Sequence, residues 1–313
     1  MVRNMPNKVY ITGATGRLGS AVLARLPDAI PLVRKPSGLK NEIVTKFSES
    51  ELHDILKNAS VIIHLAGSVD TLDGKKLQEA NVELTRRIVS VAYPACKLIF
   101  ASSISVYGKK LAKIPADEGT KTNPDSAYAK SKLDAEEFVA SHPNHVILRI
   151  STLYGPQFED YNRVLSMIER GKMQVIGDGS NRIPFVHVDD VADAVVSAVK
   201  NGSGTYVLAG EPLTQKEIYE IAAKSLGVSP PTKSVSLQLA FGMASLHGHA
   251  YRLGAKKPAL TAEHVSILGH DRAFDCSKAK KELGFSPRPL EKGIAAMAKM
   301  YKAKLVLTRS RVG

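Results

Sequence analysis

The sequence predicts an α/β fold, a doubly wound parallel sheet with a smaller, mostly helical C-terminal region. In the first half of the chain, short apolar runs alternate with segments of helical periodicity, which is the pattern of βαβ units. These runs are rich in Val, Ile and Leu throughout, as strands buried on both faces of a parallel sheet are. A length of 313 residues suits one large α/β domain with an appended part, or two domains.

The predicted elements can be placed in order along the chain. The clearest strands span residues 9–12, 30–33, 61–65, 97–102 and 146–150, and the helices between them span 18–26, 77–93 and 127–140. The last of these helices follows a capping sequence that ends in Ser126, and the His142-Pro143 pair stops it. After Gly155 the alternation weakens. A strand at 185–188 and a helix at 191–199 are still expected, and the chain beyond Pro212 is mainly helical.

The net charge of +13, from 43 basic and 30 acidic residues, favours an anionic ligand. The basic residues are dispersed, and no tract of five or six like charges occurs, so nucleic acid is not an expected partner. No run of 18 apolar residues and no signal-peptide core occurs either. We therefore expect a cytoplasmic protein with no membrane partner.

The spacing of the cysteine and histidine residues does not indicate a metal site. Cys96 and Cys276 lie far apart with no C-x-x-C spacing, so neither a disulfide framework nor a structural zinc site is expected. His247 and His249 occur in a segment with no third ligand in view. The sequence thus predicts no bound metal.

The turn after the first strand carries three glycines in the spacing G-x-x-G-x-x-G, at Gly13, Gly16 and Gly19, and a helix follows at once. Glycines allow a sharp bend and a close approach of backbone amides to a pyrophosphate, and the helix N-terminus adds a favourable dipole. The alternative is a tight turn that binds nothing. Because strand, turn and helix occur in the required order, we interpret the segment as the dinucleotide-binding turn of a Rossmann fold.

The second strand helps to predict which dinucleotide binds. An acidic residue at its end would take the ribose hydroxyls of NAD(H), but Val33 is followed by Arg34 and Lys35. These cations suit a 2′-phosphate, unless they are merely solvated loop charges. We therefore expect NADP(H) to be preferred and NAD(H) to be possible, with Arg17 as a further contact.

Tyr128 and Lys132 are spaced i, i+4 on one face of a predicted helix. Tyr93 and Lys97 share this spacing, but Pro94 between them breaks a helix. A serine-rich segment from 102 to 108 lies at the carboxyl end of a strand, where ligands of open α/β sheets bind. There a serine can hold a substrate oxygen while a tyrosine transfers the proton. Lowering a tyrosine pKa by about three units takes roughly 4 kcal/mol, which a lysine and an oxidised nicotinamide could largely supply.

These motifs resemble the extended short-chain dehydrogenase/reductases, the epimerase/dehydratase superfamily. The resemblance rests on Thr12 to Gly19, His64 to Gly67, Asn81, Ser103 to Gly108 and Tyr128 with Lys132, and it continues through Leu148 to Pro156, Phe185 to Ala192 and Asp275 to Phe285. It covers nearly the whole chain. It implies a hydride-transfer enzyme that uses a nicotinamide dinucleotide.

The resemblance also implies roles for single residues. Ser103 matches the substrate-orienting residue, Tyr128 the acid/base, and Lys132 the residue that binds the nicotinamide ribose and lowers the tyrosine pKa. The implied cofactor site comprises Gly13, Thr15, Gly16, Arg17, Leu18, Gly19, Arg34, Leu65, Ala66, Gly67, Tyr128 and Lys132. Asn81 matches a structural asparagine beneath it.

The family further implies a discontinuous Rossmann domain, residues 1–155 and 185–210, and a substrate-binding domain, residues 156–184 and 211–313. A homodimer is expected. The substrate would be a small molecule, either a hydroxy or keto compound or a nucleotide sugar, contacted by Ser103, Thr152 and Arg182.

Departures from the family pattern narrow the chemistry. Ile104 and Ser105 stand where sugar-nucleotide dehydratases have an Asp-Glu pair, so dehydration is not expected. Thr152 stands where many epimerases hold the diphosphate with asparagine, although Arg182 resembles a diphosphate-binding arginine. The run from Leu260 to Gly284 resembles relatives that act on hydroxysteroids and dihydroflavonols. A ketone reductase or alcohol dehydrogenase and a nucleotide-sugar 4-epimerase therefore both remain, with a non-catalytic NADP(H)-binding regulator or assembly subunit as the alternative.

Overall fold

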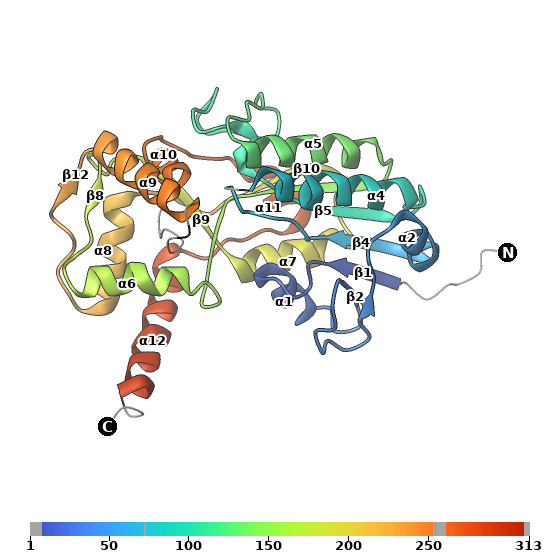
Figure 1. The fold of residues 1–313 in the computed structure, drawn as a ribbon, viewed down its shortest axis with the longest axis horizontal. Helices are drawn as coiled ribbons and strands as arrows, with labels where there is room; N and C mark the ends of the chain where they lie inside the picture. Colours follow the sequence, from blue (N-terminus) through green and yellow to red (C-terminus); the bar gives the residue numbers. More distant parts are fainter. Residues whose placement is uncertain (1–7, 72, 253, 255–260, 310–313) are drawn as a thin grey trace.

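A seven-stranded parallel sheet forms the centre of the molecule in a computed structural model, which describes residues 8–71, 73–252, 254 and 261–309. The strands lie in the order β10-β6-β5-β4-β1-β2-β3 (Figure 1). Their bounds are Lys8–Thr12 for β1, Ile30–Val33 for β2, Ile43–Val44 for β3, Ala59–His64 for β4, Lys97–Ser103 for β5, His145–Ile150 for β6 and Gly204–Leu208 for β10. This order confirms the doubly wound fold.

Helices cover both faces of this sheet (Figure 1). On one face lie α1 (Arg17–Leu23) and α7 (Val188–Ala198), which pack together. On the other lie α4 (Leu84–Val91) and α5 (Ala127–Ser141), with α2 (Glu49–Leu56) beside α4. The helix expected at 77–93 is instead three consecutive pieces: α3 (Gly74–Leu77), the π-helical turn η1 (Gln78–Glu83) and α4.

Two small sheets and further helices gather at the other end of the molecule. β7 (Thr152–Tyr154), β9 (Arg182–His187) and β11 (Pro212–Thr214) form one sheet, and β8 (Val175–Ile176) pairs with β12 (Ser234–Val235). The helices there are α6 (Asp160–Glu169), α8 (Gln215–Leu226), α9 (Leu237–Arg252), α10 (Ala262–Leu268) and α12 (Leu290–Arg309). The strand expected at 185–188 corresponds to β9, which belongs to the small sheet. The chain rejoins the central sheet later, at β10.

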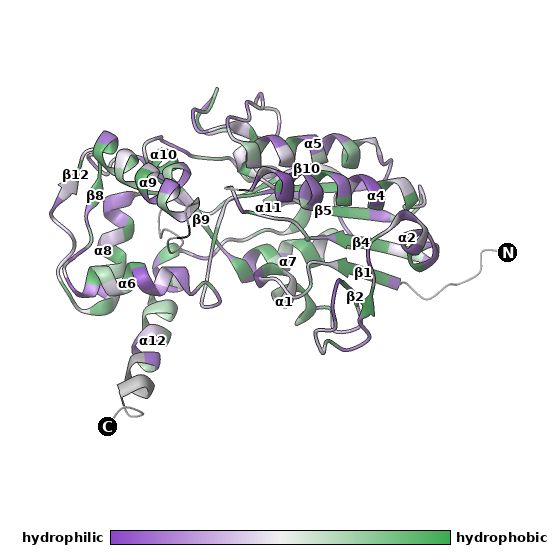
Figure 2. Ribbon diagram, in the orientation of Figure 1, coloured by the Kyte–Doolittle hydropathy of each residue, from purple (hydrophilic) through white to green (hydrophobic). Residues whose placement is uncertain are grey.

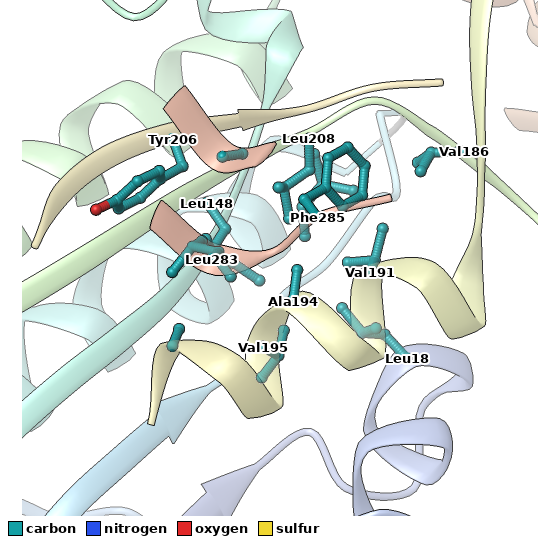
Figure 3. Close-up of a cluster of buried hydrophobic side chains, with 14 of the residues drawn as sticks. Leu18, Leu148, Val186, Val191, Ala194, Val195, Tyr206, Leu208, Leu283 and Phe285 are labelled. Carbon is teal, nitrogen blue, oxygen red and sulfur yellow. The ribbon is translucent and has the colours of Figure 1, made fainter. Parts of the chain in front are cut away.

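The C-terminal part also returns to the Rossmann core. Figure 3 shows Leu283, the last residue of α11 (Ser277–Leu283), and Phe285, which follows the helix, among side chains of α7, β6 and β10. The central strands are mostly hydrophobic, whereas hydrophilic residues gather on outer helices such as α4 (Figure 2). The division into two domains stays a prediction. Some of its residues, 1–7, 72, 253, 255–260 and 310–313, lie outside the described ones, as does Leu260 of the C-terminal run.

Candidate active site

The glycine turn between β1 and α1 is packed tightly against the end of β4. Gly13 has φ +72°, and a Cβ there would lie 2.6 Å from the backbone nitrogen of Ala66. A Cβ at Gly19 would overlap the carbonyl oxygen of Gly13. The amide of Gly16 donates to that same carbonyl over 3.0 Å. Glycine is therefore required at Gly13 and Gly19 by backbone packing, and the turn lies directly beside residues 65–67.

A chain of hydrogen bonds inside the protein fixes the end of β4. His64 is fully buried, with Nδ1 2.7 Å from Thr12 Oγ1 and Nε2 2.9 Å from Thr85 Oγ1. Because Thr85 donates its own proton to the carbonyl of Asn81, it must accept from Nε2–H of His64, and Thr12 then donates to Nδ1. Burial lowers the pKa of His64 to about 3, with a further contribution from Lys132. The imidazole is neutral, with the proton on Nε2.

Asn81 joins the cofactor side of the site to helix α5. Its Oδ1 accepts from the amide of Ser68, and its Nδ2 donates to the carbonyl of Ser68 and to Ser131 Oγ. Ser131 in turn donates to the carbonyl of Tyr128. A Cβ at Gly67 would lie 2.8 Å from Asn81 Oδ1 and 3.4 Å from Lys132 Nζ. The structural role that the family resemblance implies for Asn81 thus has a visible basis, since the π-helical turn presents this amide to both segments.

The three predicted catalytic residues come from β5 and α5. Ser103 ends β5, and its Oγ accepts from the amide of Ser105 over 3.2 Å and lies 2.6 Å from Ser105 Oγ. Tyr128 lies in the first turn of α5, where Ser126 caps the helix by accepting from the amide of Ala129. Lys132, one turn later, is buried and donates to the carbonyl of Ala101 over 2.7 Å. These three residues therefore converge at the carboxyl end of β5.

The electrostatics of this group are set mainly by burial. Burial raises the pKa of Tyr128, and a hydrogen bond with Ser103 acts in the opposite direction. Burial lowers the pKa of Lys132 to about 8, while Glu136 raises it. The protein's own groups thus favour a neutral phenol. The lowering that the sequence predicts for Tyr128 needs the positive nicotinamide as a further contribution.

A buried ion pair behind the site was missed by the sequence prediction. Glu136 continues the row of Tyr128 and Lys132 along α5. Its two carboxylate oxygens accept from Arg149 of β6, Oε1 from Nε over 3.1 Å and Oε2 from the NH2 group over 2.7 Å. Arg149 also donates to Tyr107 Oη over 2.9 Å, and Ser102 donates to Glu136. The i, i+4 spacing from Lys132 was the available signal for Glu136. The partner on another strand could not be read from spacing.

The remaining predicted cofactor residues lie around the glycine turn. Thr15 is exposed, and Leu18 is buried in the core under α1. Arg17 pairs with Asp160 over 3.2 Å and lies 4.5 Å from the ring of Phe158, so it is already engaged by the chain. Arg34 is exposed just after β2, and its guanidinium is 6.0 Å from the ring of Phe47. Arg34 is thus available to a ligand at this edge of the sheet.

The predicted substrate residues belong to the small sheet. Thr152 begins β7 and is partly buried. Arg182 begins β9, and Asp271 accepts from its Nε over 2.8 Å and from its NH2 group over 2.6 Å. The guanidinium therefore already has a carboxylate partner.

The other sequence expectations can be located as well. Tyr93 lies beyond the end of α4 and Lys97 begins β5, so this second Tyr-Lys spacing does not lie on one helix. Across the described residues, no cluster of three or more His, Cys, Asp or Glu side chains is arranged to hold a metal ion. In the same part of the chain, no helix combines the length and apolar character needed to cross a bilayer.

Comparison with known proteins defines the class of protein. The chain matches the model of the NAD dependent epimerase/dehydratase family over residues 9–210, which is more than half of its length. The protein belongs to this family, and it is an enzyme of the extended short-chain dehydrogenase/reductase type.

Individual relatives and solved structures are similar to this chain along most of its length. The 3beta-hydroxysteroid-dehydrogenase/decarboxylase isoform 1 of Arabidopsis thaliana is 29% identical, over 90% of this chain and 68% of its own. Short-chain dehydrogenase/reductase family 42E member 1 of Homo sapiens is 26% identical, over 92% of this chain and 86% of its own. Among solved structures, MoeE5 in complex with UDP-glucose and NAD is 25% identical with a TM-score of 0.72, covering 96% of this chain and 100% of that chain.

Proposed function

We propose that this chain transfers hydride between a nicotinamide dinucleotide and a secondary alcohol or ketone carbon, with Ser103, Tyr128 and Lys132 at the reacting centre. The observation that carries the proposal is the convergence of these side chains at the carboxyl end of β5. Lys132 donates to the carbonyl of Ala101 in β5 and lies next to Gly67, and Ser103, at the end of the same strand, opposes the rise that burial causes in the pKa of Tyr128. Ligands of open α/β sheets bind at this edge.

The residues around the site suit a dinucleotide. The Gly13–Gly19 turn supplies backbone amides without side chains in the way, Lys132 supplies an ammonium for a ribose hydroxyl, and Arg34 supplies an exposed guanidinium. When bound, the nicotinamide accepts or donates the hydride. NADP(H) is the preferred cofactor in this proposal because Arg34 suits a 2′-phosphate, and NAD(H) remains possible.

The chain's own residues handle the proton and the orientation. Tyr128 gives its hydroxyl proton to the substrate oxygen during reduction and takes it back during oxidation. Ser103 Oγ holds that oxygen in place. The Lys132 ammonium, fixed by the carbonyl of Ala101, favours the phenolate form of Tyr128.

Two kinds of enzyme could use this chemistry, and they differ in their substrates. A ketone reductase or alcohol dehydrogenase is supported by the engagement of Arg182 with Asp271, which leaves less positive charge for a diphosphate, and by the names of the hydroxysteroid-dehydrogenase relatives. A nucleotide-sugar 4-epimerase is supported by the similarity to MoeE5, which was solved with UDP-glucose. We further propose that the protein is a cytoplasmic homodimer. Sedimentation of the purified protein tests the oligomeric state.

The experiment is to purify the protein, identify the dinucleotide it retains with its redox state, and assay secondary alcohols, ketones and UDP-sugars. A dehydrogenase changes the absorbance of the nicotinamide in proportion to product, whereas an epimerase interconverts sugars with no net change. Tyr128→Phe should remove either activity, and Tyr93→Phe should not. The opposite result is a protein that binds the dinucleotide, turns over none of these compounds and behaves in the same way when Tyr128 is replaced by Phe. That result would identify a regulator or assembly subunit.

A further inference from the structure

Arg272 lies between α10 and α11 in the sequence, but its side chain reaches the turn that follows Ser103. This arginine is 4% exposed. Its NH2 group donates to the carbonyl of Ile104 over 3.0 Å and to that of Gly108 over 3.2 Å. These two carbonyls belong to the first residue and the C-terminal cap of the 3₁₀ turn η2 (Ile104–Tyr107). One guanidinium nitrogen therefore holds both ends of this turn.

Each of these two peptide groups continues toward the reacting centre. The peptide between Ile104 and Ser105 directs its oxygen to Arg272 and its N–H to Ser103 Oγ, 3.2 Å away. The second of the two peptide groups, between Gly108 and Lys109, directs its oxygen to Arg272 and its N–H to Asp125 Oδ2, 2.9 Å away. Asp125 lies just before the cap of α5, the helix that carries Tyr128.

The charge of Arg272 acts mostly on these carbonyls. Its NH2 group donates to the two backbone oxygens, and its Nε is buried with no hydrogen-bond partner among the residues that the structure describes. Asp125 and Glu263 are the acidic groups near it, and Lys109 bridges both at 3.1 and 3.4 Å. Burial lowers the pKa of Arg272 to about 10, so it is protonated at neutral pH. A buried cation against a carbonyl oxygen polarises that peptide and strengthens the hydrogen bond from its N–H.

We propose that Arg272 is a positioning residue for Ser103. By holding and polarising the Ile104–Ser105 peptide, it keeps Ser103 Oγ as the acceptor of the Ser105 N–H. With Ser105 Oγ, 2.6 Å away, as the donor in the contact between the two hydroxyls, the proton of Ser103 is left to be donated toward the substrate oxygen. This inference rests on the proposed function, because it assigns Ser103 to the substrate oxygen. Arg272 itself touches no reacting atom in this account.

Turnover of the wild-type enzyme's best substrate tests the coupling between Arg272 and Ser103. Arg272→Gln should lower kcat about tenfold, with an unchanged dissociation constant for the dinucleotide. Arg272→Lys, which keeps the charge, should recover part of the loss. In a Ser103→Ala background, Arg272→Gln should change kcat less than about twofold, since the residue it acts through is gone. Equal losses with and without Ser103 would show a general structural role and overturn the proposal.

Hydrogen exchange of the backbone amides tests the same contact with no substrate at all. Arg272→Lys should speed exchange in residues 104–109 while leaving α7 unchanged. The control is Arg288→Lys, which disturbs a different arginine that donates to Asp190 of α7 over 2.8 Å. It should leave residues 104–109 unchanged. Unaltered exchange in Arg272→Lys would refute the proposal even if the enzyme turns over a substrate. If no substrate is turned over, the proposed function fails while exchange still decides whether Arg272 holds the turn.

Discussion

The polar side chains around β4 and the large apolar side chains on helix α9 are placed in opposite ways. Around β4, His64, Thr85 and Asn81 are buried and hydrogen-bonded to one another. On α9, large apolar side chains face outward, with Leu239, Phe241, Met243 and Leu246 each between 46% and 71% exposed.

This difference predicts how strongly each region responds to substitution. The buried polar network leaves little freedom in the residues that line the cofactor side, because an unpaired polar group there would cost about 1–3 kcal/mol. The surface of α9 is under no such constraint from the folded chain. The cofactor half should therefore be sensitive to single substitutions and α9 tolerant of them.

The largest effect is expected in the glycine turn. Gly19→Ala places a Cβ against the carbonyl oxygen of Gly13 and the Cα of Ala14, both backbone atoms that cannot move aside alone. We expect loss of dinucleotide binding together with a lower Tm, measured by calorimetry and thermal unfolding. Gly242→Ala on α9, where a Cβ meets open space, is the control. Normal dinucleotide affinity in Gly19→Ala would contradict the packing described here.

The next effect concerns pH and His64. Its pKa is about 3 in the folded protein and near the ordinary 6.5 when unfolded, so the unfolded chain binds more protons between these values. Stability should therefore fall as pH drops below about 6.5, by up to about 2 kcal/mol between pH 7 and pH 5 from this residue. His64→Gln, measured by urea unfolding, should be less stable at pH 7 and lose less on acidification.

The exposed His53 provides the matched control for that experiment. His53→Gln should keep the wild-type dependence of unfolding free energy on pH. If His64→Gln and the wild type lose equal stability between pH 7 and pH 5, the buried imidazole is not the source.

A smaller effect is expected at Arg34. Arg34→Asp should weaken binding of NADP(H) at least about tenfold more than binding of NAD(H), which corresponds to about 1.4 kcal/mol. Lys40→Asp makes the same charge change at another exposed position of the following loop and should not discriminate between the two. Isothermal titration with both dinucleotides measures this. Equal weakening of both would remove the support for an NADP(H) preference.

The smallest effect is expected on α9. Leu246→Ala removes an apolar side chain that is 71% exposed and should change the unfolding free energy by less than about 0.5 kcal/mol. Leu226→Ala, at a position 5% exposed on α8, should cost about 2–5 kcal/mol. A large loss in the α9 variant would mean that this face is covered in solution.

Short-range patterns were sufficient to predict much of the fold. The β2 strand has the predicted bounds and β1, β5 and β6 differ by one residue at an end, because strands buried on both faces are apolar along their length. The π-helical turn was not predicted, since what it achieves is a tertiary contact, the presentation of Asn81 to Ser68 and Ser131. The pairing of β9 with β7 and β11 also depends on contacts that periodicity does not encode.

The candidate site divides in the same way. The glycine spacing and the Tyr128–Lys132 pair are local, and the structure brings them to the same edge of the sheet. Arg272 reaches Ile104 across 168 positions, and nothing in its local sequence indicates that target. The neutral state of His64 likewise comes from burial, and burial cannot be predicted from a local sequence motif.

The most direct test of the central claim is to measure dinucleotide affinity and turnover together in Tyr128→Phe. We expect an affinity close to that of the wild type and a kcat lower by a factor on the order of 10² or more, because the phenyl ring keeps the packing but has no proton to transfer. An unchanged kcat would contradict the role assigned to this tyrosine.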